Sequence, residues 1–92
     1  MEIIRDGPVS PHRQIADSFR ERIHRGEFHA DQRLPSETDI VNDTGTARTT
    51  VRRAMKVLRD EGLVYTVQSR GTFVKPEAVA HLADGPPADR DE

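Results

Sequence analysis

The 92-residue chain has no cysteine and no tryptophan, and its only aromatic residues are three phenylalanines and one tyrosine. The lack of cysteine excludes disulfide bonds and thiolate metal ligands, and it fits a reducing cytosol. No apolar run reaches membrane-spanning length, and the first ten residues lack the basic and apolar regions of a signal peptide. We therefore predict a cytoplasmic protein that has no membrane partner.

Sequence signals of enzymes are also missing. No serine lies in a nucleophile-elbow context, and no glycine-rich phosphate loop follows a strand. The four histidines do not have the spacing of metal ligands. Because only 34% of the residues are hydrophobic, a chain of this length can build only a small core. We predict one small domain with no enzyme activity, no cofactor, no metal and no small-molecule effector site.

Charge is distributed unevenly, although the net charge is only -2. From residue 48 to residue 75 seven basic residues stand against two acids, whereas five acids and one arginine follow residue 76. Phosphate binding depends on the local charge density, so the local excess matters more than the total. A basic helix face that is simply solvated is the alternative. The basic residues of the segment are Arg48, Arg52, Arg53, Lys56, Arg59, Arg70 and Lys75.

Two helices are expected in the first half of the chain. Ser10 and Pro11 predict the start of the first helix, with Ser10 as its N-cap, and Gly26 predicts its end. The second helix is expected to begin at Ser36, which forms a capping box with Asp39, and to run to about residue 43. Before these helices, residues 3 and 4 could form an edge strand.

A third helix over residues 47–61 follows a turn at Gly45. Four apolar residues of this helix fall at positions i, i+3, i+4 and i+7, which predicts a buried stripe; they are Val51, Ala54, Met55 and Leu58. Most of its basic residues and its threonines are left on the other faces. Residues 63–67 and 72–74 then read as two short strands joined by a wing at residues 68–71.

Three motifs together, LPSE, ARTTVRRAMKVLRDEGLV and SRGTFV, resemble the winged helix-turn-helix of GntR-type bacterial transcription regulators. The resemblance covers about residues 8–75. It implies an α+β, mainly α fold with three helices and a C-terminal β-hairpin wing. It also implies a homodimeric DNA-binding repressor, usually with a larger C-terminal domain that binds an effector. The chain lacks such a domain, so we expect either a naturally short regulator or a DNA-binding domain taken from a longer protein.

The third helix carries the expected contacts with DNA. Arg48 and Arg52 lie four residues apart on one helix face, where a guanidinium can form two hydrogen bonds with guanine. Thr49 and Thr50 lie in the first turn, where hydroxyls and backbone N–H groups can hold a phosphate. Arg53 is expected to bind a phosphate or a neighbouring acid. The alternative for each arginine is a surface ion pair, which stabilises little.

The wing is expected to supply a second set of contacts. Arg70 would enter or flank the minor groove, and Gly71 would allow the backbone to approach closely. Gln68 and Ser69 are candidates for phosphate or groove contacts, and Ser36 is first a cap and second a phosphate contact. The alternative for the glycine is a role in the hairpin turn alone.

Four residues depart from the pattern of the family. Thr38 stands where a basic residue is common, so one expected DNA contact is missing. Ala47 occupies a position where a serine or threonine usually caps the recognition helix, a loss of about 1 kcal/mol unless Thr46 takes over as the cap. Thr44 and Thr46 also occupy positions that are usually apolar. We therefore expect a less stable helix-turn-helix or a shifted operator preference.

The sequence divides into three segments: a lead at residues 1–9, a winged helix-turn-helix domain at 10–75, and an acidic tail at 76–92. The tail is predicted to be disordered apart from a short turn around residues 78–83. The predicted function is repression of transcription by a homodimer on a short palindromic operator of double-stranded DNA. The dimer could form through the lead, or only on DNA. The alternative is a winged-helix module that binds another protein, for which Arg48 and Arg52 would be dispensable.

Overall fold

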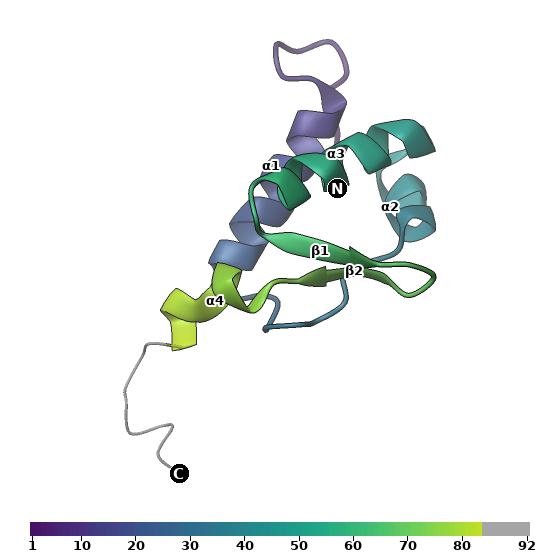
Figure 1. Ribbon diagram of the computed structural model, residues 1–92. Helices are drawn as coiled ribbons and strands as arrows, with labels where there is room; N and C mark the ends of the chain where they lie inside the picture. The colour runs from purple at the N-terminus through teal and green to yellow at the C-terminus, as the bar shows by residue number, and fades with distance from the viewer. Residues whose placement is uncertain (84–92) are drawn as a thin grey trace.

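Residues 1–83 are described by the computed structural model, in which four helices and one hairpin follow one another (Figure 1). The elements are α1 (Pro11–His24), α2 (Glu37–Thr44), α3 (Arg48–Asp60), β1 (Val64–Val67), β2 (Gly71–Val74) and α4 (Pro76–Ala83). The predicted winged helix-turn-helix order is confirmed. In the described part of the chain, no helix is both long enough and apolar enough to cross a bilayer.

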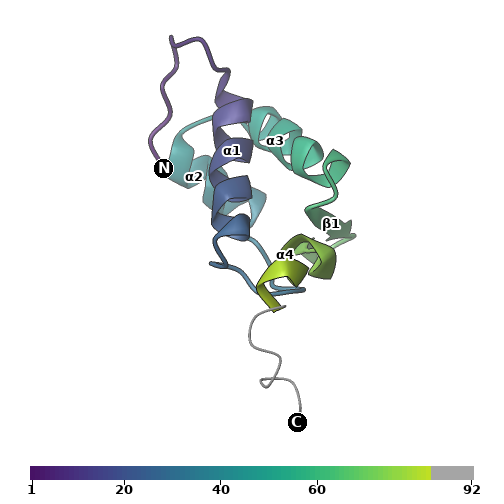
Figure 2. The ribbon, with the colours of Figure 1, turned by 90° about the vertical axis from the view of Figure 1, so that its left-hand side faces the viewer.

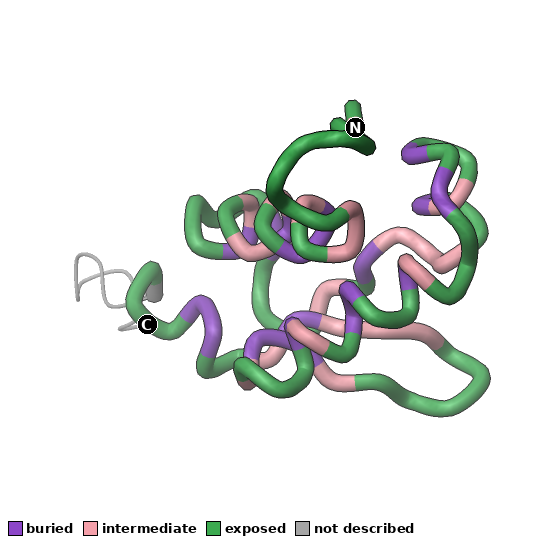
Figure 3. The backbone as a smooth tube through the Cα atoms, turned by 90° about the horizontal axis from the view of Figure 1, so that it is seen from above, coloured by how far each residue is buried: buried purple, intermediate pink, exposed green. Residues whose placement is uncertain are grey.

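The core is formed where α3 crosses α1. The predicted stripe of α3 is buried, and it meets a matching stripe of α1. In Figure 3 the buried positions, in purple, recur along the helical turns and alternate with exposed ones. Phe28 folds back onto this core, and its ring centroid lies 6.3 Å from that of Phe19. The α1 stripe consists of Ile15, Ala16, Phe19 and Ile23.

The caps of the first two helices differ. The predicted capping box of α2 is present: the Asp39 N–H donates to Ser36 Oγ at 3.0 Å, and the Ser36 N–H donates to Asp39 Oδ2 at 3.3 Å. The predicted side-chain cap at Ser10 is wrong, since its hydroxyl lies 3.2 Å from the His12 ring instead. The Arg13 N–H is already bonded to the Ser10 carbonyl, which leaves that donor without need of the hydroxyl.

Two buried threonines flank the turn between α2 and α3. Gly45 has the left-handed φ of 71° that the turn requires. Thr44 Oγ1 donates to the Ile40 carbonyl at 2.7 Å and lies 2.8 Å from Thr46 Oγ1. These hydrogen bonds within the turn offset the free-energy cost of burying the two hydroxyl groups. Thr46 does not take over as the cap of α3, because Ala47 occupies that position without a side-chain bond.

The hairpin is extended by a segment that the sequence did not reveal as a strand. The Leu34 N–H donates to the Thr72 carbonyl at 2.8 Å, and the Val74 N–H donates to the Gln32 carbonyl at 2.9 Å. Arg33 forms an isolated bridge with Phe73 of β2. The chain just before α2 is thus fixed along the outer edge of the wing, although it is too short to show an alternating pattern.

The N-terminal lead packs against the domain without forming a strand. The suggested edge strand at Ile3 and Ile4 is wrong, because the side chain of Gln14 bonds both the N–H and the carbonyl of Ile4, at 2.9 and 2.6 Å. Arg5 donates to the Gly45 carbonyl at 2.8 Å. The lead is therefore tied to the turn that precedes α3.

The tail was predicted to be disordered apart from a short turn around residues 78–83, whereas residues 76–83 are helical. These residues form α4, which packs at the end of α1 (Figure 2). Ala78 and Val79 are buried, and Leu82 lies close to Gly26. The apolar residues of this segment find a partner in α1, and burial outweighs its polar flanks. The remainder of the predicted tail lies outside the described residues.

An ion pair joins α1 to the end of α3. Arg20 Nε and Nη2 each lie 2.7 Å from a carboxylate oxygen of Glu61, and Arg20 also pairs with Asp17. The hydrogen bonds from Arg20 hold the pKa of the Glu61 carboxyl below its ordinary value of 4.5. The stability that this pair contributes is present at neutral pH.

We predict that Glu61→Gln destabilises the domain at pH 7 and has little effect at acidic pH. The pKa of Glu61 is lowered in the folded state, so its contribution is complete above the unfolded value of 4.5 and is lost as pH falls through the lower folded value. Urea unfolding of both proteins from pH 3 to pH 7 measures this. A difference that stays constant with pH would contradict the role of the charge.

We predict that Val79→Asp lowers the free energy of unfolding by about 2 kcal/mol, because it places a carboxylate in a buried position. Ala80→Asp is the matched control, since Ala80 is exposed on the same helix. Urea unfolding monitored by circular dichroism measures both. Equal stability of the two variants would contradict the docking of α4.

Candidate nucleic-acid interface

The outer face of α3 carries the predicted DNA-binding residues. Because the apolar stripe of α3 faces α1, Arg48 and Arg52 point away from the core, with side chains 45% and 63% exposed. Thr49 and Arg53 are also exposed, and Thr50 is half-buried. The first half of α3 therefore presents cations and hydroxyls to solvent.

Glu37, in the first turn of α2, brings the two arginines together. Its carboxylate accepts from Arg52 Nε at 3.1 Å and from Arg48 Nη1 at 3.5 Å. Arg48 Nη2 also donates to Thr38 Oγ1 at 3.0 Å. The surface ion pair, which was the alternative considered for these arginines, is thus present in the free protein. Exposed pairs of this kind stabilise little, so the guanidinium groups remain available to a ligand.

The start of α3 offers unpaired backbone donors. Ala47 provides no side-chain cap, and the first bonds of the helix run from the N–H groups of Thr50 and Val51 to the Ala47 carbonyl. The N–H groups of Arg48 and Thr49 meet no acceptor within residues 1–83. An uncapped helix start combines free donors with the positive end of the helix dipole, and both favour an anion.

The tip of the wing is exposed and tightly turned. The Arg70 N–H donates to the Val67 carbonyl at 3.0 Å, and Gln68, Ser69 and Arg70 are all exposed. Gly71 has a φ of 127°, as expected for a glycine in this turn, and Ser69 also has a positive φ, of 67°. Left-handed backbone at a non-glycine residue is uncommon and is found at functional loops.

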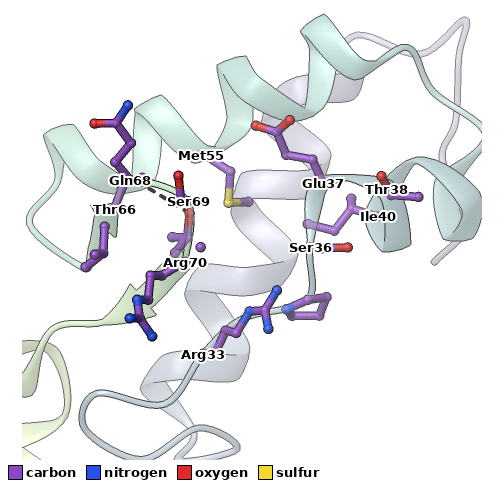
Figure 4. A pocket seen from close by; sticks show the side chains of 14 residues that line it. Arg33, Ser36, Glu37, Thr38, Ile40, Met55, Thr66, Gln68, Ser69 and Arg70 are labelled. Carbon is purple, nitrogen blue, oxygen red and sulfur yellow. Dashed lines mark hydrogen bonds between the residues drawn. The ribbon is translucent and has the colours of Figure 1, made fainter.

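A groove of about 410 Å³ separates the wing from the start of α2, and Met55 of α3 also lines it (Figure 4). It brings together five of the ten predicted site residues: Ser36, Gln68, Ser69, Arg70 and Gly71. The five on α3 lie outside its lining, but Glu37 and Thr38, which line it, hold Arg48 and Arg52. The two predicted sets of contacts are therefore neighbours on one face.

Sequence reasoning missed two contributors to this face. No contact with α3 was predicted for Glu37, because its reach to α3 depends on how the two helices cross. Arg33 lines the groove and lies beside Gly71, where an added Cβ would be 3.0 Å from Arg33 Nε. No local pattern distinguishes Arg33 from other surface arginines.

Metal chemistry finds no support in this geometry. Among residues 1–83, no group of three or more histidines or acids is placed so that it could hold a metal ion.

Comparison with protein families identifies the domain. The model of the family described as "Bacterial regulatory proteins, gntR family" matches residues 11–74. The chain belongs to the GntR family. The predicted resemblance is thereby confirmed, and the match of the GntR domain runs from the start of α1 to the end of the wing.

Two curated relatives of this GntR domain are named as repressors. The HTH-type transcriptional repressor NagR of Bacillus subtilis (strain 168) is 40% identical over 85 residues, which are 92% of this chain and 35% of that protein. The mannosyl-D-glycerate transport/metabolism system repressor MngR of Escherichia coli (strain K12) is 41% identical over 68 residues, 74% of this chain and 28% of that protein. The chain thus spans about a third of the length of these relatives.

Solved structures confirm the winged-helix fold. The DNA-binding domain of AraR, in a complex with its operator ORR3, matches with a TM-score of 0.70 and 32% identity, covering 79% of this chain and 95% of that one. YtrA from Sulfolobus acidocaldarius, a GntR-family transcription factor, matches with a TM-score of 0.74 and 32% identity, covering 88% and 85%. The sequence match and the fold match therefore agree on the GntR family.

We predict that Glu37→Gln loosens the Arg52 guanidinium in the free protein. Loss of an exposed ion pair, worth roughly 0.4–1 kcal/mol, should raise the solvent exchange rate of the Arg52 Hε about two- to fivefold. Nuclear magnetic resonance of the arginine side chains measures this rate. Glu77→Gln, an exposed change on α4, is the control and should leave the rate unchanged. The same rate in Glu37→Gln would show that the carboxylate does not hold the arginine.

Proposed function

We propose that this GntR domain binds an operator in double-stranded DNA, with α3 in the major groove and the wing at the adjacent minor groove. One observation carries the proposal: Glu37 holds Arg48 and Arg52 and also lines the groove whose other wall includes Arg70. Cations of the helix and of the wing thus lie on one face. Two such elements side by side suit neighbouring grooves of a duplex.

Arg48 and Arg52 are proposed to read bases. A guanidinium that bonds guanine O6 and N7 contributes about 1–3 kcal/mol of discrimination. In the free protein Glu37 occupies some of the same donors. Because an exposed ion pair contributes at most about 1 kcal/mol, exchange of the carboxylate for a guanine edge is favourable.

Phosphates are proposed to bind at the start of α3 and beside α2. The hydroxyls of Thr49 and Thr50 lie next to the free N–H groups of the uncapped helix. Ser36 Oγ accepts from the Asp39 N–H, and its own hydrogen can still be donated to a phosphate oxygen. Arg53 has an exposed side chain and no hydrogen-bonding partner within residues 1–83, so it is proposed to bind phosphate rather than an acid of the protein.

The wing is proposed to make the minor-groove contacts. Arg70 would enter or flank the groove from the tip of the hairpin, with Gln68 and Ser69 beside it on the exposed turn. Gly71 keeps the backbone free of a side chain that would meet Arg33.

Repression by a homodimer on a palindromic operator completes the proposal. The named relatives are repressors, and AraR was solved on an operator. A protein dimer with two-fold symmetry reads a site with the same symmetry. In the cytoplasm of a bacterium, such a dimer on DNA would block access of the polymerase. The dimer would form through the lead or only on DNA.

We predict that selection from a randomised duplex pool enriches a palindrome for the wild-type chain, and that Arg48→Ala loses this enrichment. Loss of one bidentate contact should lower affinity for the selected site about 5- to 150-fold, the equivalent of roughly 1–3 kcal/mol. Arg25→Ala, an exposed change at the end of α1, is the control and should keep the enrichment. Absence of enrichment in the wild type would favour a winged-helix module that binds a protein.

A further inference from the structure

Arg33 is an exposed cation in the groove between α2 and the wing, and its backbone is held against β2. Its backbone forms a bridge with Phe73, and the next residue, Leu34, is buried and bonded to β2. Its side chain lies along Gly71, where an added Cβ would come within 3.0 Å of Arg33 Nε. In Figure 4 Arg33 and Arg70 lie on the same side of the groove, across from Glu37. The guanidinium of Arg33 has no hydrogen bond or ion pair with any other described residue.

The acids around this groove are already engaged. Glu37 accepts from Arg48 and Arg52, Asp39 belongs to the capping box of α2, and Asp31 accepts from the Tyr65 hydroxyl at 2.7 Å. The charges without a partner in the lining are therefore those of Arg33 and Arg70. A partly enclosed groove of this charge attracts an anion.

The path of a DNA strand passes over this groove if the proposed function holds. When a helix lies in the major groove and a wing in the adjacent minor groove, one sugar–phosphate strand separates them. That strand must cross the protein surface between α3 and the wing, beside the groove, which is lined by the start of α2, by the wing and by Met55 of α3. A cation beside this path lies next to phosphates and not next to base edges.

We propose that the groove between α2 and the wing seats the phosphate backbone that divides the two DNA grooves, and that Arg33 binds a phosphate of that strand. This inference rests on the proposed function and adds a contact that helps affinity for every sequence. In this proposal the Arg33 contact fixes the register and orientation of the domain on the duplex, whereas Arg48 and Arg52 recognise the base sequence.

Fluorescence anisotropy with the selected operator and with a random duplex of equal length tests Arg33, over a series of salt concentrations. Arg33→Gln should weaken both complexes by the same factor, about three- to tenfold, and should reduce the slope of log K against log salt by about 0.9. Arg33→Lys should keep the slope of the wild type, because the charge remains. Arg13→Gln removes an exposed arginine near Glu61, at the far end of α3, and should change neither quantity.

Three outcomes would overturn the inference. An unchanged salt slope in Arg33→Gln, with a folded protein by circular dichroism, would show that Arg33 meets no phosphate. A loss confined to the operator, with the random duplex unaffected, would make Arg33 a base-reading residue. If the wild-type chain binds neither duplex at any salt concentration, the proposed function itself fails, and this result is distinct from a defect of Arg33 alone.

Discussion

Packing of α3 against α1 is the constraint on which the remaining structure depends. Four apolar residues of α3 are buried there, and their spacing fixes the rotation of the helix about its axis. Arg48 and Arg52 must then face outward beside α2, where Glu37 meets them. The wing follows directly from the end of α3, so its position is set by the same packing. A shift of the stripe by one residue would turn the basic face away from the wing.

Around this frame the interface is held by weak, exchangeable contacts. Glu37 keeps both arginines close to α2, while the start of α3 lacks a side-chain cap and leaves two N–H groups with no acceptor among residues 1–83. Each of these features stabilises the free domain little or not at all. Each also supplies donors that an anionic ligand can use. A small loss of stability in the free protein is therefore consistent with a gain in affinity for the ligand.

Sequence was sufficient where local chemistry determines structure. The capping box of α2, the glycine turn before α3 and the buried stripe of α3 are confirmed, because each depends on residues within a few positions. The strand-like segment at Arg33, the Glu37 contact and α4 depend on partners far along the chain, and they were missed or wrongly assigned. Ser10 occupies the N-cap position of α1, but its side chain forms no cap bond. The Arg13 N–H, which the hydroxyl would have accepted from, is already bonded to the Ser10 carbonyl.

The most direct measurement of the central claim is a titration of the isotope-labelled chain with its selected duplex, followed by nuclear magnetic resonance. The account predicts that backbone and arginine signals change at residues 33–38, 47–53 and 68–71, which form one face, while the signals of α4 and of the far end of α1 stay in place. Changes that gather at the lead or at α4, with α3 and the wing unaffected, would contradict it.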